Sequence, residues 1–444
     1  MNIKIAQGNE EINSTGGIIL VGKLLALNAW EKINDMTTAR IKRGEISHGD
    51  ILKIAAALLA LGKTDFADID LYRNDPLFKK ALDLKKIPSA ETLRQRLNDL
   101  GLLNCGQTMI DSCLVELLKK VKDFGEIQTQ YGSYIPLDID VSVMLNPDCK
   151  KEGVSWTYHN ENGYAPIFAY LGTHGYMLAN ELREGSQHSA KGAVEFADRC
   201  IDLAKRIGLE LEKLLVRVDS GHDDKDFIAA LCASGVKFLV KRNLRTECRE
   251  QYLAMARRIG EKVVSREGKN IYRCILSHRK PEGLENKPVF MIVEVVERLT
   301  DAKTEEEFLI PEVEVSAWWT NLPESEAVCI GLYHAHGTSE QFHGELKSDM
   351  GLELLPSGKL ATNALILNSV VLSYNCLRII GQESLNCAEL LPIKIDVERR
   401  RIRSVLQDLI YIGCKFTRHA KQIIVKFGRN CPWYNVFRAI YARC

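Results

Sequence analysis

The stretch YIPLDIDVSVML, residues 134–145, marks the point where the sequence changes from helical periodicity to alternation. Apolar and polar residues take turns along it, which is typical of a half-buried β-strand. One face of that strand carries Ile135, Leu137, Ile139 and Val141. The opposite face carries two acids, Asp138 and Asp140.

Strands and helices follow in a regular order toward the C-terminus. Two strand-like runs, residues 165–172 and 176–185, flank a Thr-His-Gly turn and predict a hairpin. Next come a helix over 189–208, a short apolar strand that ends at Asp219, a helix over 224–235 and a strand over 236–242. Three antiparallel strands followed by βαβ units predict a mixed sheet with helices on its faces.

The first third of the chain is predicted to be helical. Residues 50–62 have apolar residues at helical spacing, with Asp50 expected as the N-cap and Gly62 as the stop. In residues 88–101, Ser89 is expected to cap a helix whose buried stripe is Leu93, Leu97 and Leu100. Its arginines suit a helix-turn-helix-like DNA-binding region, and a plain helical support domain fits equally well.

The chain of 444 residues has room for several domains and a net charge of only +1. We expect a multidomain α/β protein whose regions are helical and DNA-binding (1–128), mixed-sheet (129–243), all-β insertion (244–323), mixed-sheet again (324–385), and basic and helical (386–444).

Basic charge is concentrated in two places. Residues 393–444 contain twelve Lys or Arg against three acids, and residues 237–258 contain seven against two. Two such stretches in a nearly neutral chain favour a polyanionic partner. The thirteen cysteines form no CxxC pair, and the first apolar run, from Gly16, is too short to span a bilayer. We therefore expect a cytoplasmic protein without a membrane partner.

Three acids are candidates for chemistry because of their positions. Asp140 lies on the polar face of the first strand, Asp219 ends a later strand, and Glu340 lies in a segment that returns after the insertion. Carboxylates that converge at a sheet edge can hold two divalent cations, and oxygen ligands favour Mg²⁺ or Mn²⁺. Asp219, followed by Ser and Gly, also fits an ordinary turn residue.

The segment YHAHGTSEQFHGELK, residues 333–347, places Tyr333, His336, Glu340 and Lys347 at spacings that fall on one helix face. Such a face would point one acid at metal ions and flank it with phosphate-binding groups. In the alternative interpretation, Thr338 begins the helix and the first two residues lie in a loop.

This segment resembles the tyrosine–arginine–glutamate–lysine (YREK) signature of bacterial insertion-sequence DDE transposases. The signature reads Tyr, two residues, Arg, three residues, Glu, six residues, Lys. Tyr333, Glu340 and Lys347 match it in identity and spacing, and His336 stands at the Arg position. Further segments resemble the same family, in order: residues 66–82 and 87–97, LDIDVS (137–142), VRVDSGH (216–222) and WTNLP (319–323).

The resemblance implies an RNase H-like catalytic domain, interrupted by the β-insertion, with Asp140, Asp219 and Glu340 as catalytic residues and ligands of two metal ions. Asp138 competes with Asp140 for the first position. Tyr333, His336 and Lys347 would bind DNA phosphates. Trp318 and Trp319 are candidates to stack on a flipped base, although buried strand tryptophans fit equally well.

The implied activity is cutting at the ends of a mobile element and joining them to target DNA, with a homodimer acting on double-stranded DNA that carries terminal inverted repeats. Two alternatives remain open at this point. One is a catalytically silent DNA-binding protein derived from a transposase, and the other is an RNase H-like nuclease without strand transfer.

Overall fold

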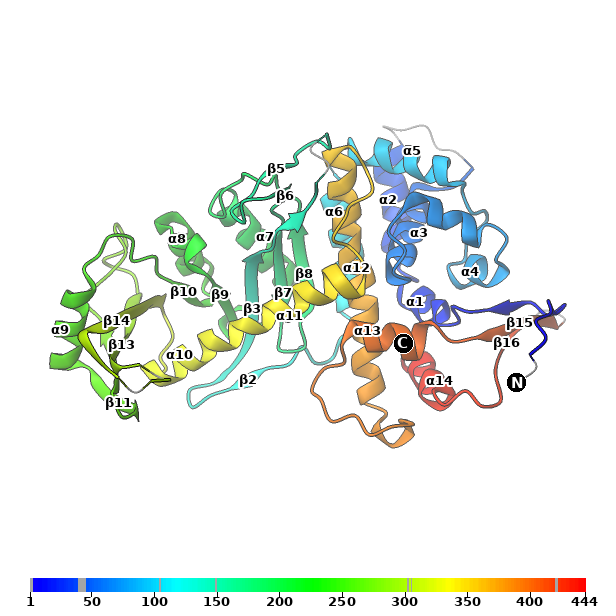
Figure 1. The fold of residues 1–444 in the computed structure, drawn as a ribbon. Helices are drawn as coiled ribbons and strands as arrows, with labels where there is room; N and C mark the ends of the chain where they lie inside the picture. The colour runs from blue at the N-terminus through cyan, green and yellow to red at the C-terminus, as the bar shows by residue number, and fades with distance from the viewer. Residues whose placement is uncertain are drawn as a thin grey trace.

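A ten-stranded sheet forms the centre of the computed structural model (Figure 1), which describes residues 3–38, 45–103, 105–147, 150–301, 303–304, 306–419 and 422–444. The strand order is β11-β12-β13-β14-β10-β9-β3-β7-β8, and β2 pairs with β3 outside this path. The bounds are β2 Ile127–Gln128, β3 Ser133–Val141, β7 Ile167–Leu171, β8 Tyr176–Glu181, β9 Leu214–Val218, β10 Lys237–Lys241, β11 Glu261–Arg266, β12 Lys269–Leu276, β13 Phe290–Thr300 and β14 Glu307–Thr320.

The part of the sheet formed by β8, β7, β3, β9 and β10 contains both parallel and antiparallel strands, as the sequence predicts. β7 is antiparallel to both β3 and β8, whereas β9 is parallel to both β3 and β10. The helices α7 (Ala193–Ile207) and α8 (Lys225–Ser234) connect β8 to β9 and β9 to β10. In the β7–β8 turn, Gly172 has a φ of +72°, and a Cβ there would lie 1.8 Å from the Phe124 carbonyl oxygen. The hairpin therefore requires glycine at this position.

The expected all-β insertion is wrong because it contains a helix. Helix α9 (Arg249–Ile259) lies within it, and Tyr252, Leu253 and Ala256 form its buried stripe. The insertion strands extend the central sheet, since β14 pairs antiparallel with β10. The last four residues of β14, which include Trp318 and Trp319, are buried and so belong to the shared core.

The N-terminal region is helical, as expected, and also contains the short strand β1 (Ile12–Asn13). Its helices are α1 Ile18–Leu24, α2 Ala29–Thr38, α3 His48–Ala60, η1 Phe66–Tyr72, α4 Pro76–Ala81, α5 Ala90–Gly101 and α6 Gly106–Leu118. Ser89 caps α5 and the predicted leucine stripe is buried. The predicted cap Asp50 is wrong: Ser47 caps α3 and accepts a hydrogen bond from the Asp50 backbone N–H. The reason is that the helix begins at His48, three residues before Ile51, where its apolar pattern starts.

Helix α12 (Leu360–Leu385) lies between the N-terminal helices and the sheet. By length and composition it could cross a bilayer, but 89% of its apolar window is buried inside the protein, as in a core helix. The Asn375 side chain bonds both the backbone N–H and the C=O of Met177 in β8. On the other side, Ser373 donates a hydrogen bond to the Ala56 carbonyl in α3. This helix therefore joins the two halves of the molecule.

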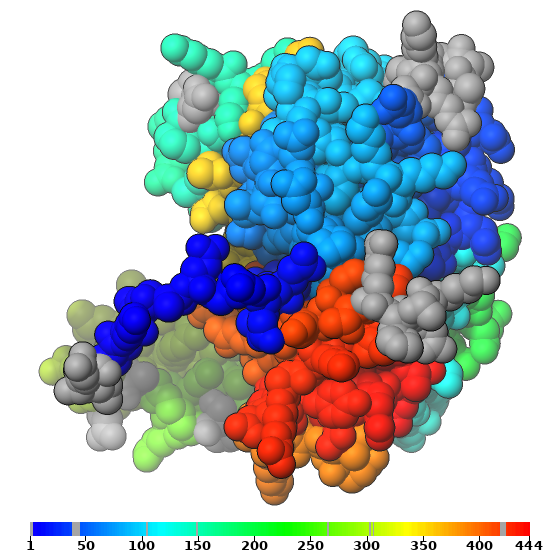
Figure 2. Space-filling view, turned by 90° about the vertical axis from the view of Figure 1, so that its right-hand side faces the viewer, coloured from blue at the N-terminus to red at the C-terminus, as the bar shows by residue number. Residues whose placement is uncertain are grey.

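The C-terminal region is only partly helical, which corrects the prediction. It contains α13 (Ile402–Val405), a π-turn η7 (Leu406–Ile410) and α14 (Tyr434–Arg443), but also the hairpin β15 (Cys414–His419) and β16 (Gln422–Phe427). β15 pairs with β1, so the two ends of the chain share one small sheet. Figure 2 shows the C-terminal residues in red and orange packed beside the N-terminal helices in blue. A second small sheet has the order β4-β6-β5, with β4 Met144–Leu145, β5 Ser155–Trp156 and β6 Asn162–Tyr164.

Candidate active site

Asp140 lies near the end of β3, and Asp219 directly follows the neighbouring parallel strand β9. β3 and β9 pair in the register Asp138 with Arg217 and Ile139 with Val218, so Asp140 and Asp219 follow side by side. The Asp138 and Arg217 side chains contact one another on one face of the sheet. Because side chains alternate in a strand, Asp140 and Asp219, two residues further on, emerge on that same face. Strands about 4.8 Å apart thus bring two carboxylates together at the carboxyl end of β9.

The Asp219 carboxylate is fixed by its own turn. It caps the 3₁₀ turn η3 (Ser220–His222), accepting hydrogen bonds from the Gly221 N–H at 3.1 Å and from His222 Nδ1 at 2.8 Å. Burial would raise the pKa of Asp219, but the hydrogen bond and charge of His222 outweigh it and hold that pKa below its ordinary value. Asp219 is therefore both the turn residue that the sequence allowed and an ionised, half-exposed carboxylate.

The Asp140 carboxylate is contacted by a histidine from the helical segment that follows the insertion. His343 Nε2 lies 3.3 Å from Asp140 Oδ2, and the other carboxylate oxygen accepts the Val141 N–H at 2.8 Å. His343 is itself buried, and its Nδ1 lies 3.3 Å from the Tyr170 hydroxyl. This places Asp140 in a defined orientation beside Asp219.

The charges of both carboxylates help to raise the pKa values of two tyrosines. Burial raises the pKa of Tyr158 to about 12, and the charges of Asp140 and Asp219 act in the same direction. Burial and the same two charges also raise the pKa of Tyr333. Since each phenol is influenced by both acids, Asp140 and Asp219 create one shared region of negative potential.

Tyr333 to Lys347 lie on continuous helical backbone, so the alternative with a lead-in loop is not observed. The segment consists of α10 (Glu326–His334), the 3₁₀ turn η4 (Ala335–Thr338), α11 (Ser339–Gly344) and the π-turn η5 (Glu345–Asp349). In Figure 1, α10 and α11 appear as one yellow helical ribbon crossing the sheet. Thr338 is helical and caps nothing. Such irregular turns inside helices are frequent at functional sites.

Glu340 lies on α11 with an exposed side chain, between two histidines that contact β3. His336, four residues before it, lies 2.9 Å from Asp138, and His343, three residues after it, contacts Asp140. At these spacings the three residues share one side of the helical segment. In the described part of the chain, no three His, Cys, Asp or Glu side chains lie close enough to hold a metal ion. The structure thus brings Asp140 and Asp219 together and leaves Glu340 on the adjoining helix.

Asp138 has a different environment from Asp140. It is buried and accepts two hydrogen bonds from Arg217, at 2.6 and 2.7 Å, besides the one from His336. Burial opposes its ionisation, but Arg217 and His336 outweigh that effect, so the pKa of Asp138 is below its ordinary value. Arg217 also donates to the Leu332 carbonyl, which ties the sheet to α10. Asp138 therefore serves the packing of sheet and helix, whereas Asp140 is open to solvent.

The residues expected to bind phosphate are engaged with protein atoms in this structure. Tyr333 is buried against Trp318, His336 contacts Asp138, and the Lys347 ammonium donates to the Val143 carbonyl. Burial lowers the pKa of Lys347, and the charges of Glu353 and Asp140 act against that shift. Lys347 therefore lies near the aspartates, and the phosphate-binding role of all three residues stays a prediction.

Trp318 and Trp319 are core residues. Trp318 is 2% and Trp319 5% exposed, which leaves neither ring a free face for a flipped base. The Trp319 indole also donates to Asp223, and Arg242 lies over its ring. Of the two possibilities in the sequence, the structure has buried strand tryptophans, because both belong to the half of β14 that joins the central sheet.

Sequence reasoning missed four residues that shape this site: Tyr158, Arg217, His222 and His343. Two carried a signal, since Arg217 alternates with Asp219 on β9 and His343 follows Glu340 at helical spacing. His222 lies in the turn after Asp219, within the segment VRVDSGH. Tyr158 reaches the site from the small β4-β6-β5 sheet, and no local pattern indicates it.

The family model described as "Transposase DDE domain group 1" matches residues 1–444. The chain belongs to this family. It is a DDE transposase, an enzyme that cleaves DNA and transfers DNA strands. Among solved structures, the transposase is similar to a piggyBac transposase synaptic complex with hairpin DNA, at 12% identity and a TM-score of 0.40, covering 89% of this chain and 79% of that one. A search of curated proteins finds no match to the transposase.

Proposed function

We propose that this transposase mobilises an insertion sequence, cutting the element's ends and joining them to target DNA with Asp140, Asp219 and Glu340 as its catalytic residues. The observation that carries the proposal is the register of β3 and β9, which makes Asp140 and Asp219 neighbours at one strand end. The helix with Glu340 is fastened to the same strand by His336 and His343.

An RNase H-like catalytic domain is part of this proposal. Its support is the strand order β8-β7-β3-β9-β10, in which an antiparallel three-stranded unit continues into two parallel strands connected by helices. The mixed YREK match, with His336 at the Arg position, supports a bacterial insertion-sequence origin. We place the enzyme in the bacterial cytoplasm, as a homodimer on double-stranded DNA with terminal inverted repeats.

The donor set fits hard divalent cations. Asp140 and Asp219 offer only oxygen atoms, they are adjacent, and Asp219 is ionised at neutral pH because its pKa is lowered. Asp140, Asp219 and Glu340 would hold two Mg²⁺ or Mn²⁺ ions, which supply activation of the attacking oxygen and stabilisation of the leaving oxygen. His222 and His343 orient the two aspartates, and Lys347 provides positive charge beside them.

Cleavage and joining of DNA that carries the element's own ends test the proposal. We expect Asp140→Asn, Asp219→Asn and Glu340→Gln each to abolish Mg²⁺-dependent cleavage while the affinity for end DNA is retained. Glu212→Gln, which changes an exposed acid at the opposite end of β9 from Asp219, is the control and should cleave like the unaltered enzyme.

Cleavage by the Asp219→Asn variant at the unaltered rate would refute the catalytic assignment. Precut ends with a free 3′-hydroxyl separate transposition from simple hydrolysis: joining to a target plasmid is expected, and cleavage without any joining would leave a nuclease as the function.

A further inference from the structure

The β13–β14 ribbon carries an exposed apolar bulge. Arg298 pairs with Glu312 and Thr300 with Glu307, so Leu299 alone faces four residues of β14, Phe308 to Pro311. We call these four residues the β14 bulge. Leu309 is fully exposed and Ile310 is 83% exposed. Bulges of this kind re-aim side chains, and contiguous exposed apolar groups mark interaction sites.

The charge next to the β14 bulge is negative. Glu306 and Glu307 directly precede it, both exposed, and neither carboxylate pairs with a cation anywhere in the described residues. Arg298 forms ion pairs with Glu312 and Glu314, which follow the β14 bulge in the sequence. An apolar projection beside unpaired acids is repelled by DNA phosphates, so its partner is a protein surface.

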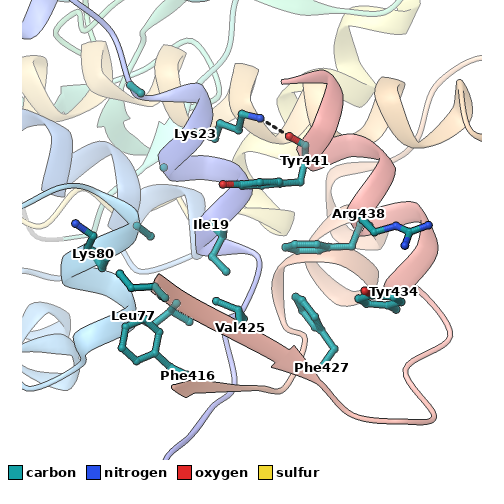
Figure 3. Close-up of a pocket in the computed structure, with 15 residues that line it drawn as sticks. Ile19, Lys23, Leu77, Lys80, Phe416, Val425, Phe427, Tyr434, Arg438 and Tyr441 are labelled. Atoms are coloured by element: carbon teal, nitrogen blue, oxygen red, sulfur yellow. Dashed lines mark hydrogen bonds between the residues drawn. The ribbon is translucent and has the colours of Figure 1, made fainter. Parts of the chain in front are cut away.

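A groove of about 550 Å³ lies at the other end of the molecule, between α1, α4, the β15–β16 hairpin and α14 (Figure 3). We call it the C-terminal groove. Its walls are apolar and include Ile19, Leu77, Phe416, Val425, Phe427 and Tyr441. A volume in this range accepts a ligand of drug-like size, which is comparable to a pair of large aliphatic side chains.

The charged groups that line the C-terminal groove are all cationic. They are Lys23, Lys80 and Arg438, and the lining includes no acid. Lys23 donates to the Tyr441 carbonyl, and Lys80 makes only an exposed contact of 3.9 Å with Asp83. Within the described part of the chain, the Arg438 guanidinium has no carboxylate partner, and it lies 5.9 Å from the Tyr434 ring. The groove therefore complements the β14 bulge in both polarity and sign of charge.

One chain cannot bring the two features together. Figure 1 shows β13 and β14 at one end of the molecule and β15, β16 and α14 at the other. We propose that the β14 bulge of one copy docks into the C-terminal groove of a second copy, with Leu309 and Ile310 in the groove and Glu306 and Glu307 facing Lys80 and Arg438. A two-fold axis would then form the contact twice in one closed dimer. This rests on the proposed homodimer and assigns its interface.

Sedimentation velocity without DNA tests this interface on the full chain. The double variant Leu309→Asp/Ile310→Asp should raise the dimer dissociation constant by at least about 100-fold, because two contacts each lose a buried aliphatic pair. Ile393 is 59% exposed and lies outside the bulge and the groove. The variant Ile393→Asp is therefore the matched control and should leave the dimer dissociation constant unchanged. An unaltered chain that is monomeric at high concentration, or a double variant that dimerises normally, would overturn the proposal.

Charge reversal tests the orientation of the contact. Arg438→Glu should weaken the dimer, and Glu307→Lys in the same chain should restore it. In addition, an equimolar mixture of the Leu309→Asp/Ile310→Asp variant with the Arg438→Glu variant should form a heterodimer through one intact contact. If Glu307→Lys does not restore the Arg438→Glu dimer, the pairing is wrong. If removing the exposed N-terminal Ile3 and Ile5 dissociates the dimer while the bulge variant does not, the N-terminal arm fills the groove instead.

Failure of this interface is separable from failure of the proposed function. The bulge and groove lie away from Asp140 and Asp219, so a monomeric bulge variant should still nick a single end, and only concerted joining of two ends should fall. Absence of cleavage by the unaltered enzyme would refute the proposed function, whereas an unaltered dimer in the bulge variant refutes only the interface.

Discussion

Asp138 and Asp140 occupy one face of β3, two residues apart, yet their surroundings separate their roles. Asp138 is 2% exposed and bonded by Arg217 and His336, whereas Asp140 is partly exposed and lies beside another carboxylate. When one partner of a buried ion pair is removed, the other charge stays buried and unpaired, which destabilises the fold. Adjacent carboxylates, in contrast, repel one another.

The two positions should respond differently to the same change. Asp138→Asn leaves Arg217 without its counter-charge, so we expect a loss of about 3–5 kcal/mol in the free energy of unfolding. Asp140→Asn removes repulsion with Asp219 and should change that free energy by less than about 1 kcal/mol while abolishing cleavage. Urea unfolding at pH 7 measures both. Equal stability of the two variants would contradict the structural role of Asp138.

The pH dependence of stability should also report the ion pair between Asp138 and Arg217. Because the folded pKa of Asp138 is lowered, its contribution to stability is present above the ordinary Asp pKa of about 3.9 and is lost as pH falls through the folded value. The stability gap between the unaltered chain and Asp138→Asn should therefore be constant from pH 7 to about 5 and shrink below about 4. Unfolding at pH 3, 4, 5 and 7 measures the gap, and a gap that widens in acid would contradict this assignment.

At the scale of elements, the helical segment around Glu340 is held from behind by buried charges. Glu345, in the π-turn η5, accepts hydrogen bonds from Arg378 of α12, from Arg399 and from Tyr374. Arg401, whose side chain is exposed, donates a hydrogen bond at 2.8 Å to the buried carboxylate of Asp349. Part of the basic C-terminal stretch therefore fastens the helical segment around Glu340, which reduces the positive charge available to DNA.

Removing the charge of Glu345 should loosen this attachment. Glu345→Gln leaves the buried Arg378 with a neutral partner, and we expect a loss of about 3–5 kcal/mol in the free energy of unfolding. The surface variant Arg206→Gln, whose partner Asp202 is also exposed, should cost less than about 1 kcal/mol. Denaturant unfolding of both variants at pH 7 measures the difference. A Glu345→Gln variant with an unchanged free energy of unfolding would show that η5 is held by apolar packing alone.

Local periodicity was sufficient to predict β3, β7, β8 and β9 and the helices between them, because alternation and helical spacing are properties of neighbouring residues. It could not predict that β14 continues the sheet beyond β10, since that pairing joins strands far apart in the chain. At the site, Asp140, Asp219 and Glu340 were indicated by position. The partners Arg217 and His336 of Asp138 depend on tertiary contacts, which no spacing in the sequence encodes.

The whole molecule depends on α12, because the N-terminal helices and the sheet pack on its opposite sides. Ser373 bonds the Ala56 carbonyl of α3, and Thr362 bonds Asn98 of α5 at 2.8 Å. The leucine stripe of α5 and most of α3 are buried. The region 1–128 therefore lacks one wall of its core when residues 360–385 are absent.

An isolated fragment of residues 1–128 should accordingly fail to fold. We expect no cooperative thermal transition by circular dichroism and little protection of its amides from hydrogen exchange. The full chain is the control and should show both. A fragment that unfolds cooperatively on its own would show that α12 is dispensable for the N-terminal region.

The central position of α12 also has a consequence for synthesis of the protein. A ribosome adds about 5–20 residues per second, so α3, α5 and α6 leave the exit tunnel on the order of ten seconds to a minute before α12 does. During that interval their apolar faces are uncovered, which makes the nascent chain prone to aggregation. A chain terminated before Lys359 never receives the missing wall, so translation itself determines that only nearly complete products acquire a folded N-terminal region.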